Sequence, residues 1–438
     1  MISPQRRREI IDALRRGTVP QRGLDAFAVG TDRFAAAFDD ELATVAAGAA
    51  GFKAVRGEYG SGKTFVVRWL AERARAQGFA TAEVQISEGE TPLHHLEAVY
   101  RRLCERLTTA DTAGGALRSV VDSWFFALHE DVAAAGTAPP GDAEAVLAAT
   151  DTLAEQRLGA VAARAPALAA VLRGYRRALA VGDTARAEGL LAWLGGQPHV
   201  AASIKRAAGI RGDLDHDAAL AFLAGLLTIL RGAGYAGLVF VLDEVETLQR
   251  VRSDARDRAL NALRQLIDEV DQGRFPTLYL VVTGTPAFFD GPQGAQRLAP
   301  LAQRLHTDLT TDARFDSPRA VQLRLAGFTV DRLGEVGRRI RDLYADGAAD
   351  PGRIRSACDD DYLALLAKAV TGDLGGRVGV APRVFLKKLV GDVLDRIDQF
   401  PDFDPRRDYR LTIVDSELTA VERNARAATS VDEIDLDL

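Results

Sequence analysis

The chain is poor in the residues that build disulfides and metal centres. Its 438 residues include two cysteines, Cys104 and Cys358, far apart and without the spacing of metal ligands. We expect two buried or reduced thiols of a cytoplasmic protein. The six histidines form no cluster with ligand spacing, and no Ser-His-Asp arrangement can be argued. The sequence therefore points away from a disulfide-rich secreted domain and from a His/Cys metal site.

Long apolar runs and an excess of positive charge are also missing. No apolar run reaches the roughly 18 residues of a membrane helix, and the first residues, MISPQRRREI, lack the apolar segment of a signal peptide. We therefore expect no membrane partner. The formal net charge of −6 argues against a generally basic nucleic-acid-binding surface but leaves local basic patches open. A chain of this length is expected to form two or three units, at about 100–200 residues per domain.

One glycine-rich stretch carries a specific chemical signal. Residues 57–64 read GEYGSGKT, the full G-x-x-x-x-G-K-[ST] pattern of a P-loop, between an apolar strand and a helical pattern. The glycines let the backbone wrap around a polyphosphate with its N–H groups pointing inward. Lys63 is expected to reach the β- and γ-phosphates of ATP, and the Thr64 hydroxyl to ligate Mg²⁺. The nucleotide-binding residues expected in this loop are Gly57, Gly60, Ser61, Gly62, Lys63 and Thr64.

Two adjacent carboxylates follow another apolar strand. Residues 237–242 form a continuous apolar run, typical of a strand buried on both faces of a parallel sheet, and end at Asp243 and Glu244. We expect Asp243 to bind the nucleotide's Mg²⁺ with its water shell, and Glu244 to orient and deprotonate the attacking water. Glu246 is the alternative base, although adjacency to the strand end favours Glu244. The pair predicts ATP hydrolysis as well as binding.

A further buried strand, at 277–282, is followed by polar side chains. It ends in Thr283-Gly284-Thr285. A polar side chain at this point can contact the γ-phosphate or the attacking water. Thr283 is the first candidate for such a sensor, and Thr285 is the second.

Three arginines later in the chain are candidates for contacts with the nucleotide. Arg383 follows Pro382, which is preorganised for the first turn of a helix, and its guanidinium can pair bidentately with phosphate. Arg297 and Arg304 follow the sensor strand, and either is a candidate arginine finger for the ATP of a neighbouring subunit. The expected catalytic residues are thus Lys63, Glu244, Thr283 and Arg383.

The hydrophobic pattern predicts an α/β fold of the P-loop NTPase type. Strands expected at 52–56, 81–86, 237–242 and 277–282 alternate with helices, whereas the alanine-rich stretch from about 109 to 215 has no convincing strand. We expect five segments: N-terminal helices at 1–50, an ATPase domain at 51–327, a helical insertion within it at about 109–215, a helical lid at 328–427 and an acidic tail at 428–438.

The N-terminus contains a local basic cluster. Arg6, Arg7, Arg8, Arg15 and Arg16 lie on or beside a short expected helix, with Arg8 and Arg15 on one face. One hypothesis is that this cluster neutralises DNA phosphates. The alternative, slightly favoured, is a solvated helix that only packs near the P-loop.

These motifs resemble an AAA+ ATPase in kind and in order. More narrowly, GEYGSGKTFVVRWLAERA, VFVLDEVETLQ, LVVTGTPAFF and APRVFLKKLV are similar to the ATP-binding proteins of BREX phage-defence systems, of the BrxD type, and to origin-recognition and signal-transducing ATPases. The similarity runs from about residue 5 to 425. It implies a five-stranded αβα sandwich with a helical lid, ATP and Mg²⁺ as ligands, and antiphage defence beside methyltransferase, phosphatase-like and helicase partners.

Two functions remain open from the sequence. The first is an ATP-hydrolysing AAA+ enzyme that acts on DNA or a DNA-bound partner. A homo-oligomer is compatible with this function. The second is an ATP-gated switch or assembly scaffold with negligible turnover. Glu244 favours the first function. A helicase motor is disfavoured because no helicase motif accompanies the Walker pair.

Overall fold

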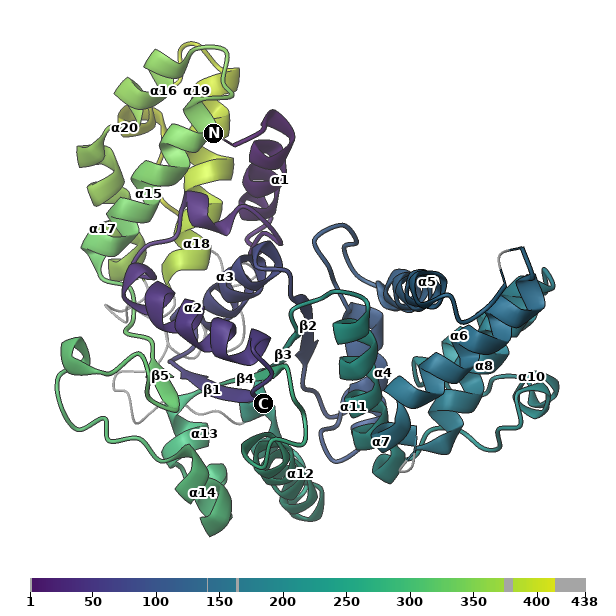
Figure 1. The fold of residues 1–438 in the computed structure, drawn as a ribbon. Helices are drawn as coiled ribbons and strands as arrows, with labels where there is room; N and C mark the ends of the chain where they lie inside the picture. The colour runs from purple at the N-terminus through teal and green to yellow at the C-terminus, as the bar shows by residue number, and fades with distance from the viewer. Residues whose placement is uncertain (1, 140, 163–164, 374–380, 414–438) are drawn as a thin grey trace.

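A computed structural model describes residues 2–139, 141–162, 165–373 and 381–413 (Figure 1). Its centre is a five-stranded sheet in the order β2-β3-β4-β1-β5, and every neighbouring pair is parallel. Each crossover between parallel strands needs a long connection, which the helices supply. The strands are β1 Gly51–Arg56, β2 Ala80–Gln85, β3 Leu238–Asp243, β4 Leu278–Gly284 and β5 Gln322–Arg324.

The strands alternate between two hydrophobic cores, one on each face of the sheet. Leu238, Phe240 and Leu242 of β3 belong to one core, whereas Val239 and Val241 belong to the other. Successive side chains of a strand point to opposite faces, so a continuous apolar run is what burial on both faces requires. The expected αβα sandwich of a P-loop NTPase is confirmed.

The two faces are covered by helices from different parts of the chain (Figure 1). On one face lie α4 Leu96–Arg106, α11 His216–Gly232, α12 Ser253–Asp271 and α14 Ala299–Leu305. On the other lie α2 Asp32–Ala46 and α3 Lys63–Ala76, and the core on this side continues to α1 Pro4–Arg15. Short helical turns complete the core region: η1 Leu24–Ala26, η2 Val245–Gln249, α13 Pro286–Asp290, η3 Ala295–Arg297 and η4 Ala313–Phe315.

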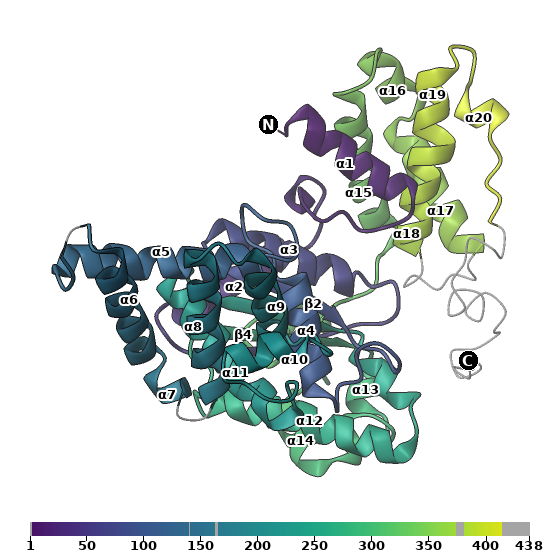
Figure 2. The same ribbon diagram turned by 90° about the vertical axis from the view of Figure 1, so that its right-hand side faces the viewer.

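The stretch expected to be a helical insertion is helical in its described residues. Its helices extend the first core away from the sheet (Figure 2). Trp124, Tyr175 and Trp193 are buried there, so the segment has an aromatic interior of its own. The helices are α5 Leu117–Ala135, α6 Ala143–Arg157, α7 Gly159–Ala162, α8 Pro166–Ala180, α9 Thr184–Leu194 and α10 Ala202–Ala207.

The C-terminal helices form a group against which the N-terminal helix packs (Figure 1). Arg15 of α1 donates from Nε to Asp395 Oδ2 at 2.6 Å, and Tyr344 donates to Asp395 Oδ1 at 2.8 Å. Helix α1 therefore lies on the expected lid. The helices of this group are α15 Val330–Ala345, α16 Pro351–Ala357, α17 Asp360–Asp373, α18 Ala381–Lys387, the π-helix η6 Lys388–Leu394, α19 Asp395–Gln399 and α20 Pro405–Asp408.

Some features differ from expectation or lie beyond the structure. The sequence reading did not locate β5 or α16, which are short. The acidic tail at 428–438 and the lid residues after 413 lie outside the described residues, and the division into segments stays a prediction.

Both cysteines are buried, and burial raises the pKa of each thiol to about 12. Among the described residues, no helix has the combined length and hydrophobicity needed to cross a bilayer.

Candidate nucleotide-binding site

The parallel register brings the ends of three strands to one edge of the sheet. Gln85 of β2 lies beside Asp243 of β3, and Leu242 lies beside Val282 of β4. Thr283 is therefore next to Asp243, and its hydroxyl donates to Asp243 Oδ1 while accepting the Glu244 N–H at 3.0 Å. Thr283 is fully buried. The first-choice sensor thus touches both acidic residues, whereas Thr285 caps the short helix α13 without a side-chain bond.

The P-loop leaves β1 and leads directly into α3. A Cβ at Gly57 would lie 2.3 Å from Ser61 Oγ, so the loop's own close approach requires glycine at this position. Gly62, the N-cap of α3, has a φ of 93°, in the left-handed region that glycine adopts without strain. The N-terminal N–H groups of α3 then point toward the loop, a ready site for a phosphate.

Lys63 is buried and its ammonium is fully engaged. Nζ donates to the carbonyl oxygens of Gly57 at 2.9 Å and Glu58 at 3.4 Å, and it lies 3.5 Å from Glu246 Oε1. The Tyr59 ring lies 5.0 Å from the same ammonium. Lys63 is therefore held among P-loop carbonyls and an acidic side chain.

Glu246 is the least satisfied acidic group at this edge. Its side chain is 3% exposed, and neither carboxylate oxygen accepts a hydrogen bond. Burial raises the pKa of Glu246, and the charge of Lys63 opposes that rise. Because a buried carboxylate without hydrogen bonds is unfavourable, Glu246 depends on Lys63 for its stabilisation.

Thr64 and Asp243 supply the oxygens expected for a magnesium site. Thr64 Oγ1 donates to Asp243 Oδ2 at 3.2 Å, and burial raises the pKa of Asp243. Neighbouring hydroxyl and carboxylate oxygens suit Mg²⁺, which takes few protein ligands and completes its shell with phosphates and water. Among the described residues, no group of three or more His, Cys, Asp or Glu side chains is placed to hold a metal ion. The residues present fit a nucleotide-bound Mg²⁺.

Glu244 adopts an unusual backbone conformation. Its φ of 61° and ψ of 44° lie in the left-handed region, which costs a non-glycine residue about 1–3 kcal/mol. The N–H bond to Thr283 helps to hold this turn. The carboxylate is held by Gln85, whose Nε2 donates to Glu244 Oε2 at 2.8 Å. The expected base is thus anchored to the neighbouring strand.

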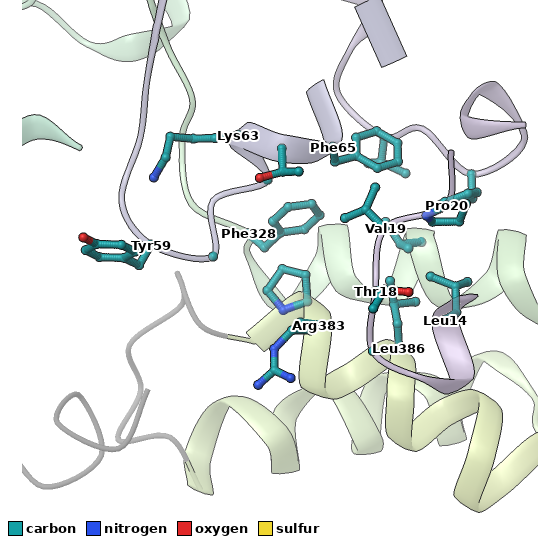
Figure 3. A pocket seen from close by; sticks show the side chains of 18 of the residues that line it. Leu14, Thr18, Val19, Pro20, Tyr59, Lys63, Phe65, Phe328, Arg383 and Leu386 are labelled. Carbon is teal, nitrogen blue, oxygen red and sulfur yellow. The ribbon is translucent and has the colours of Figure 1, made fainter. Parts of the chain in front are cut away.

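A cavity of about 280 Å³ opens beside the P-loop and has two unlike ends (Figure 3). Lys63 and Tyr59 lie at one end, and Glu246, which contacts Lys63, lines the cavity as well, as do Thr64 and Glu244. The other end is apolar, with Phe328 and Phe65 between the two. Its walls come from the end of α1, from the segment between α1 and α2, from α15 and from α18: Leu14, Val19, Pro20, Phe27, Val29, Leu333, Val336, Pro382 and Leu386.

Arg383 lines this cavity from α18. A Cβ at Gly17 would lie 3.6 Å from Arg383 Nη1, so the guanidinium lies beside the turn that follows α1. Figure 3 shows it on the lid side of the cavity, pointing away from Lys63. Its contact with phosphate stays a prediction that requires the side chain to reorient.

The two finger candidates are not part of the cavity. Arg297 pairs with Asp257 and donates to Ser253 Oγ at 2.7 Å, and Arg304 pairs with Asp268. Both face α12, and η3 and α14 lie on the opposite side of the sheet from the lid (Figure 1). Neither arginine lines the cavity, so a finger role toward a neighbouring subunit stays a prediction, and the alternative is that both are surface arginines in local ion pairs.

The sequence motifs did not predict Gln85, Tyr59 or the apolar end of the cavity as parts of the site. Gln85 had a usable signal, because it is a polar residue near the carboxyl end of the strand expected at 81–86. Glu246 was considered only as an alternative base, and its pairing with Lys63 was not foreseen. The residues of the apolar end gave no signal in the sequence, because apolar side chains of these types occur throughout the protein core.

The comparison with protein families identifies the chain's relatives. The model for "BREX system ATP-binding protein BrxC/D" matches residues 2–413, from α1 through the last described residue. No curated protein and no solved structure matched the chain in the corresponding searches. The matched segment contains the P-loop, the Asp243-Glu244 pair and the cavity. The chain therefore belongs to the family of BREX system ATP-binding proteins BrxC/D.

Proposed function

We propose that this ATP-binding protein of a phage-defence system hydrolyses ATP with Mg²⁺ as an AAA+ enzyme, and acts on DNA or a DNA-bound partner. The observation that carries the proposal is the convergence of Lys63, Thr64, Asp243, Glu244 and Thr283 at one edge of the sheet. A P-loop, an acidic pair and a buried hydroxyl at that edge are the parts phosphoryl transfer to water requires.

Nucleotide binding starts with the P-loop and Lys63. The backbone N–H groups at the start of α3 bind the β-phosphate, and Lys63 exchanges its contact with Glu246 for the phosphate oxygens. Thr64 and Asp243 hold the nucleotide's Mg²⁺, which when bound neutralises charge on the β- and γ-phosphates. The adenine enters the apolar end of the cavity, where Phe328 and Phe65 offer aromatic faces.

The chemical step requires Glu244 to leave Gln85 and face the γ-phosphate. Its carboxylate then accepts a proton from the attacking water, whose oxygen bonds to the γ-phosphorus. The bond between that phosphorus and the β-γ bridging oxygen breaks, and ADP and inorganic phosphate are released. The hydrogen bonds of Thr283 hold the backbone of Glu244 and the side chain of Asp243 in place during this step. Arg383, after reorienting, stabilises charge on the phosphates.

A second function, an ATP-gated switch with negligible turnover, is favoured by one contact. The bond from Gln85 holds Glu244 in an anchored position, and an enzyme in which it never breaks would bind ATP without hydrolysing it. The two functions differ only in whether Glu244 is released.

Steady-state phosphate release decides between these functions. The full chain is assayed with ATP and Mg²⁺, alone and with a panel of single-stranded and duplex DNA. We expect turnover that EDTA abolishes and that at least one DNA changes. Tight ATP binding together with no phosphate release under any of these conditions would overturn hydrolysis and favour the switch.

A further inference from the structure

A second hollow, separate from the nucleotide cavity, lies at the open edge of the sheet. It has a volume of about 850 Å³, within the range of about 300–1,000 Å³ that ligand sites occupy. Its walls are β2, which is the edge strand, the outer side of α3, the C-terminal half of α4 and the loop that contains Arg22. Helices α3 and α4 both contact β2, and Figure 1 shows the three elements beside one another.

The hollow is strongly basic in a protein that is acidic overall. Its lining side chains include five arginines and two glutamates, and no other charged residue. The chain as a whole has a net charge of −6. A concave surface concentrates the field of its charges, so this region attracts anions despite the overall charge.

Two of the five arginines are neutralised inside the protein. Arg68 forms a bidentate pair with Glu83, at 2.8 Å for both Nε and Nη2. Arg102 pairs with Glu90 at 2.7 Å and Glu105 at 2.9 Å. Both glutamates of the hollow are therefore paired with Arg68 or Arg102, and neither forms an ion pair with the other three arginines.

Arg22, Arg75 and Arg106 have no ion pair with any described residue. They come from three different segments, namely the loop after α1, helix α3 and helix α4. Arg75 is half-buried and donates only to Thr81 Oγ1, at 2.8 Å. Burial lowers the pKa of its guanidinium, the charge of Glu72 opposes that shift, and the charge of Arg22 adds to it. A desolvated arginine next to another cation is unfavourable unless an anion completes the site.

The ligand chemistry follows from the donors and from what the hollow lacks. Guanidinium groups pair well with phosphate oxygens. The residues lining the hollow include no aromatic side chain on which a base would stack. A ligand held here is therefore recognised through its phosphates and not through its bases.

We propose that this hollow binds the phosphate backbone of nucleic acid, independently of base sequence, through Arg22, Arg75 and Arg106. The inference rests on the DNA-directed part of the proposed function and gives it a location. The N-terminal arginines are a weaker location, because Arg6 pairs with Glu9 and Arg15 with Asp395. Binding is expected to weaken with salt, with a log–log slope of about −0.7 per phosphate for single strands.

The test measures fluorescence anisotropy of a fluorescein-labelled, mixed-sequence oligonucleotide, single-stranded and duplex, against the full chain over a range of salt. The hollow variant carries Arg22→Ala, Arg75→Ala and Arg106→Ala. The matched control carries Arg211→Ala, Arg252→Ala and Arg338→Ala, three exposed arginines that likewise have no ion pair with a described residue. Affinity of both variants for a fluorescent ATP analogue checks folding. The exposed single variant Arg106→Glu replaces the triple variant if the latter misfolds.

We expect the hollow variant to bind at least tenfold more weakly than wild type, with a salt slope flatter by about two units, and the control to bind like wild type. Equal losses in both variants, or a loss only in Arg6→Ala, Arg7→Ala and Arg8→Ala, would overturn the assignment. Binding of inorganic tripolyphosphate or an acidic peptide to the wild-type hollow, measured by calorimetry, without any oligonucleotide binding would overturn nucleic acid as the ligand. ATP turnover without nucleic acid is measured in parallel. Failure of the proposed nucleic-acid site is therefore distinguished from failure of the proposed ATP hydrolysis.

Discussion

The two ends of the nucleotide cavity are built on opposite principles. At the phosphate end, polar side chains are held by direct contacts: Lys63 by P-loop carbonyls and Glu246, and Asp243 by Thr64 and Thr283. At the other end, apolar side chains from three distant segments only enclose a volume. The first end depends on exact hydrogen bonding and charge, whereas the second depends on shape. Substitutions at the first end should therefore affect chemistry, and those at the second should affect affinity alone.

The largest effect is expected at the catalytic carboxylate. Glu244→Gln keeps the side chain's size and its bond partner Gln85 but removes the base, so turnover should fall by about 10²–10⁴-fold while ATP still binds. Rapid-quench and filter-binding measurements report the two steps separately. Glu246→Gln is the comparison, because Glu246 is the other candidate base. If Glu244→Gln turns over like wild type and Glu246→Gln does not, the assignment of the base is wrong.

Loss of the P-loop ammonium should be the next largest effect. Lys63→Ala removes the charge that contacts the phosphates, and ATP binding should weaken well beyond tenfold, which corresponds to more than about 1.4 kcal/mol. Titration calorimetry measures it, with tripolyphosphate as a second ligand that should be affected equally. Lys205→Ala, in α10 of the helical segment, serves as the control. Unchanged affinity in folded Lys63→Ala protein would remove the P-loop assignment.

The apolar end should respond in the opposite way. Phe328→Ala removes an aromatic face worth about 1–3 kcal/mol against a base, so ATP and ADP should both bind about tenfold more weakly while tripolyphosphate binding is unchanged. Phe315→Ala is the control, because Phe315 is 68% exposed and does not line the cavity. Weaker tripolyphosphate binding in Phe328→Ala would show that the two ends do not act separately.

A smaller and opposite effect is expected at the unsatisfied acid. Glu246→Gln removes the negative charge that competes with phosphates for Lys63, so ATP should bind a few-fold more tightly. The same calorimetric titration measures the change, with Glu244→Gln as the neighbouring acid for comparison. Weaker binding in Glu246→Gln would instead mean that the carboxylate positions Lys63 for the nucleotide.

The finger candidates give the smallest expected signal, because they belong to neither end. If ATP sites lie between subunits, mixing Glu244→Gln with Arg297→Ala or Arg304→Ala should restore part of the activity that each parent lacks. Sedimentation in ATP reports the oligomer. No recovery, together with a monomeric mass, would rule out a finger acting on a neighbour.

The sequence by itself determined the fold class and predicted that the P-loop, Asp243 and Thr283 would lie close together. Residues 57–64 form their turn through local glycines, and Asp243 and Thr283 follow apolar runs that have to be buried strands. Because parallel strands end at one edge, these side chains had to meet there. β5 has only three residues, Gln322–Arg324, too few for a hydrophobic pattern to show.

Only the tertiary structure decided which distant groups complete the site. Leu14, Phe328 and Leu386 line one cavity, although their residue types would suit any core position. Side-chain packing likewise determined that Gln85 binds Glu244, that Glu246 faces Lys63, and that Arg22, Arg75 and Arg106 line one hollow, where none of the three forms an ion pair with a described residue. The physical reason is range: a motif encodes contacts between neighbours along the chain, whereas charge pairing and enclosure depend on which surfaces the fold brings together.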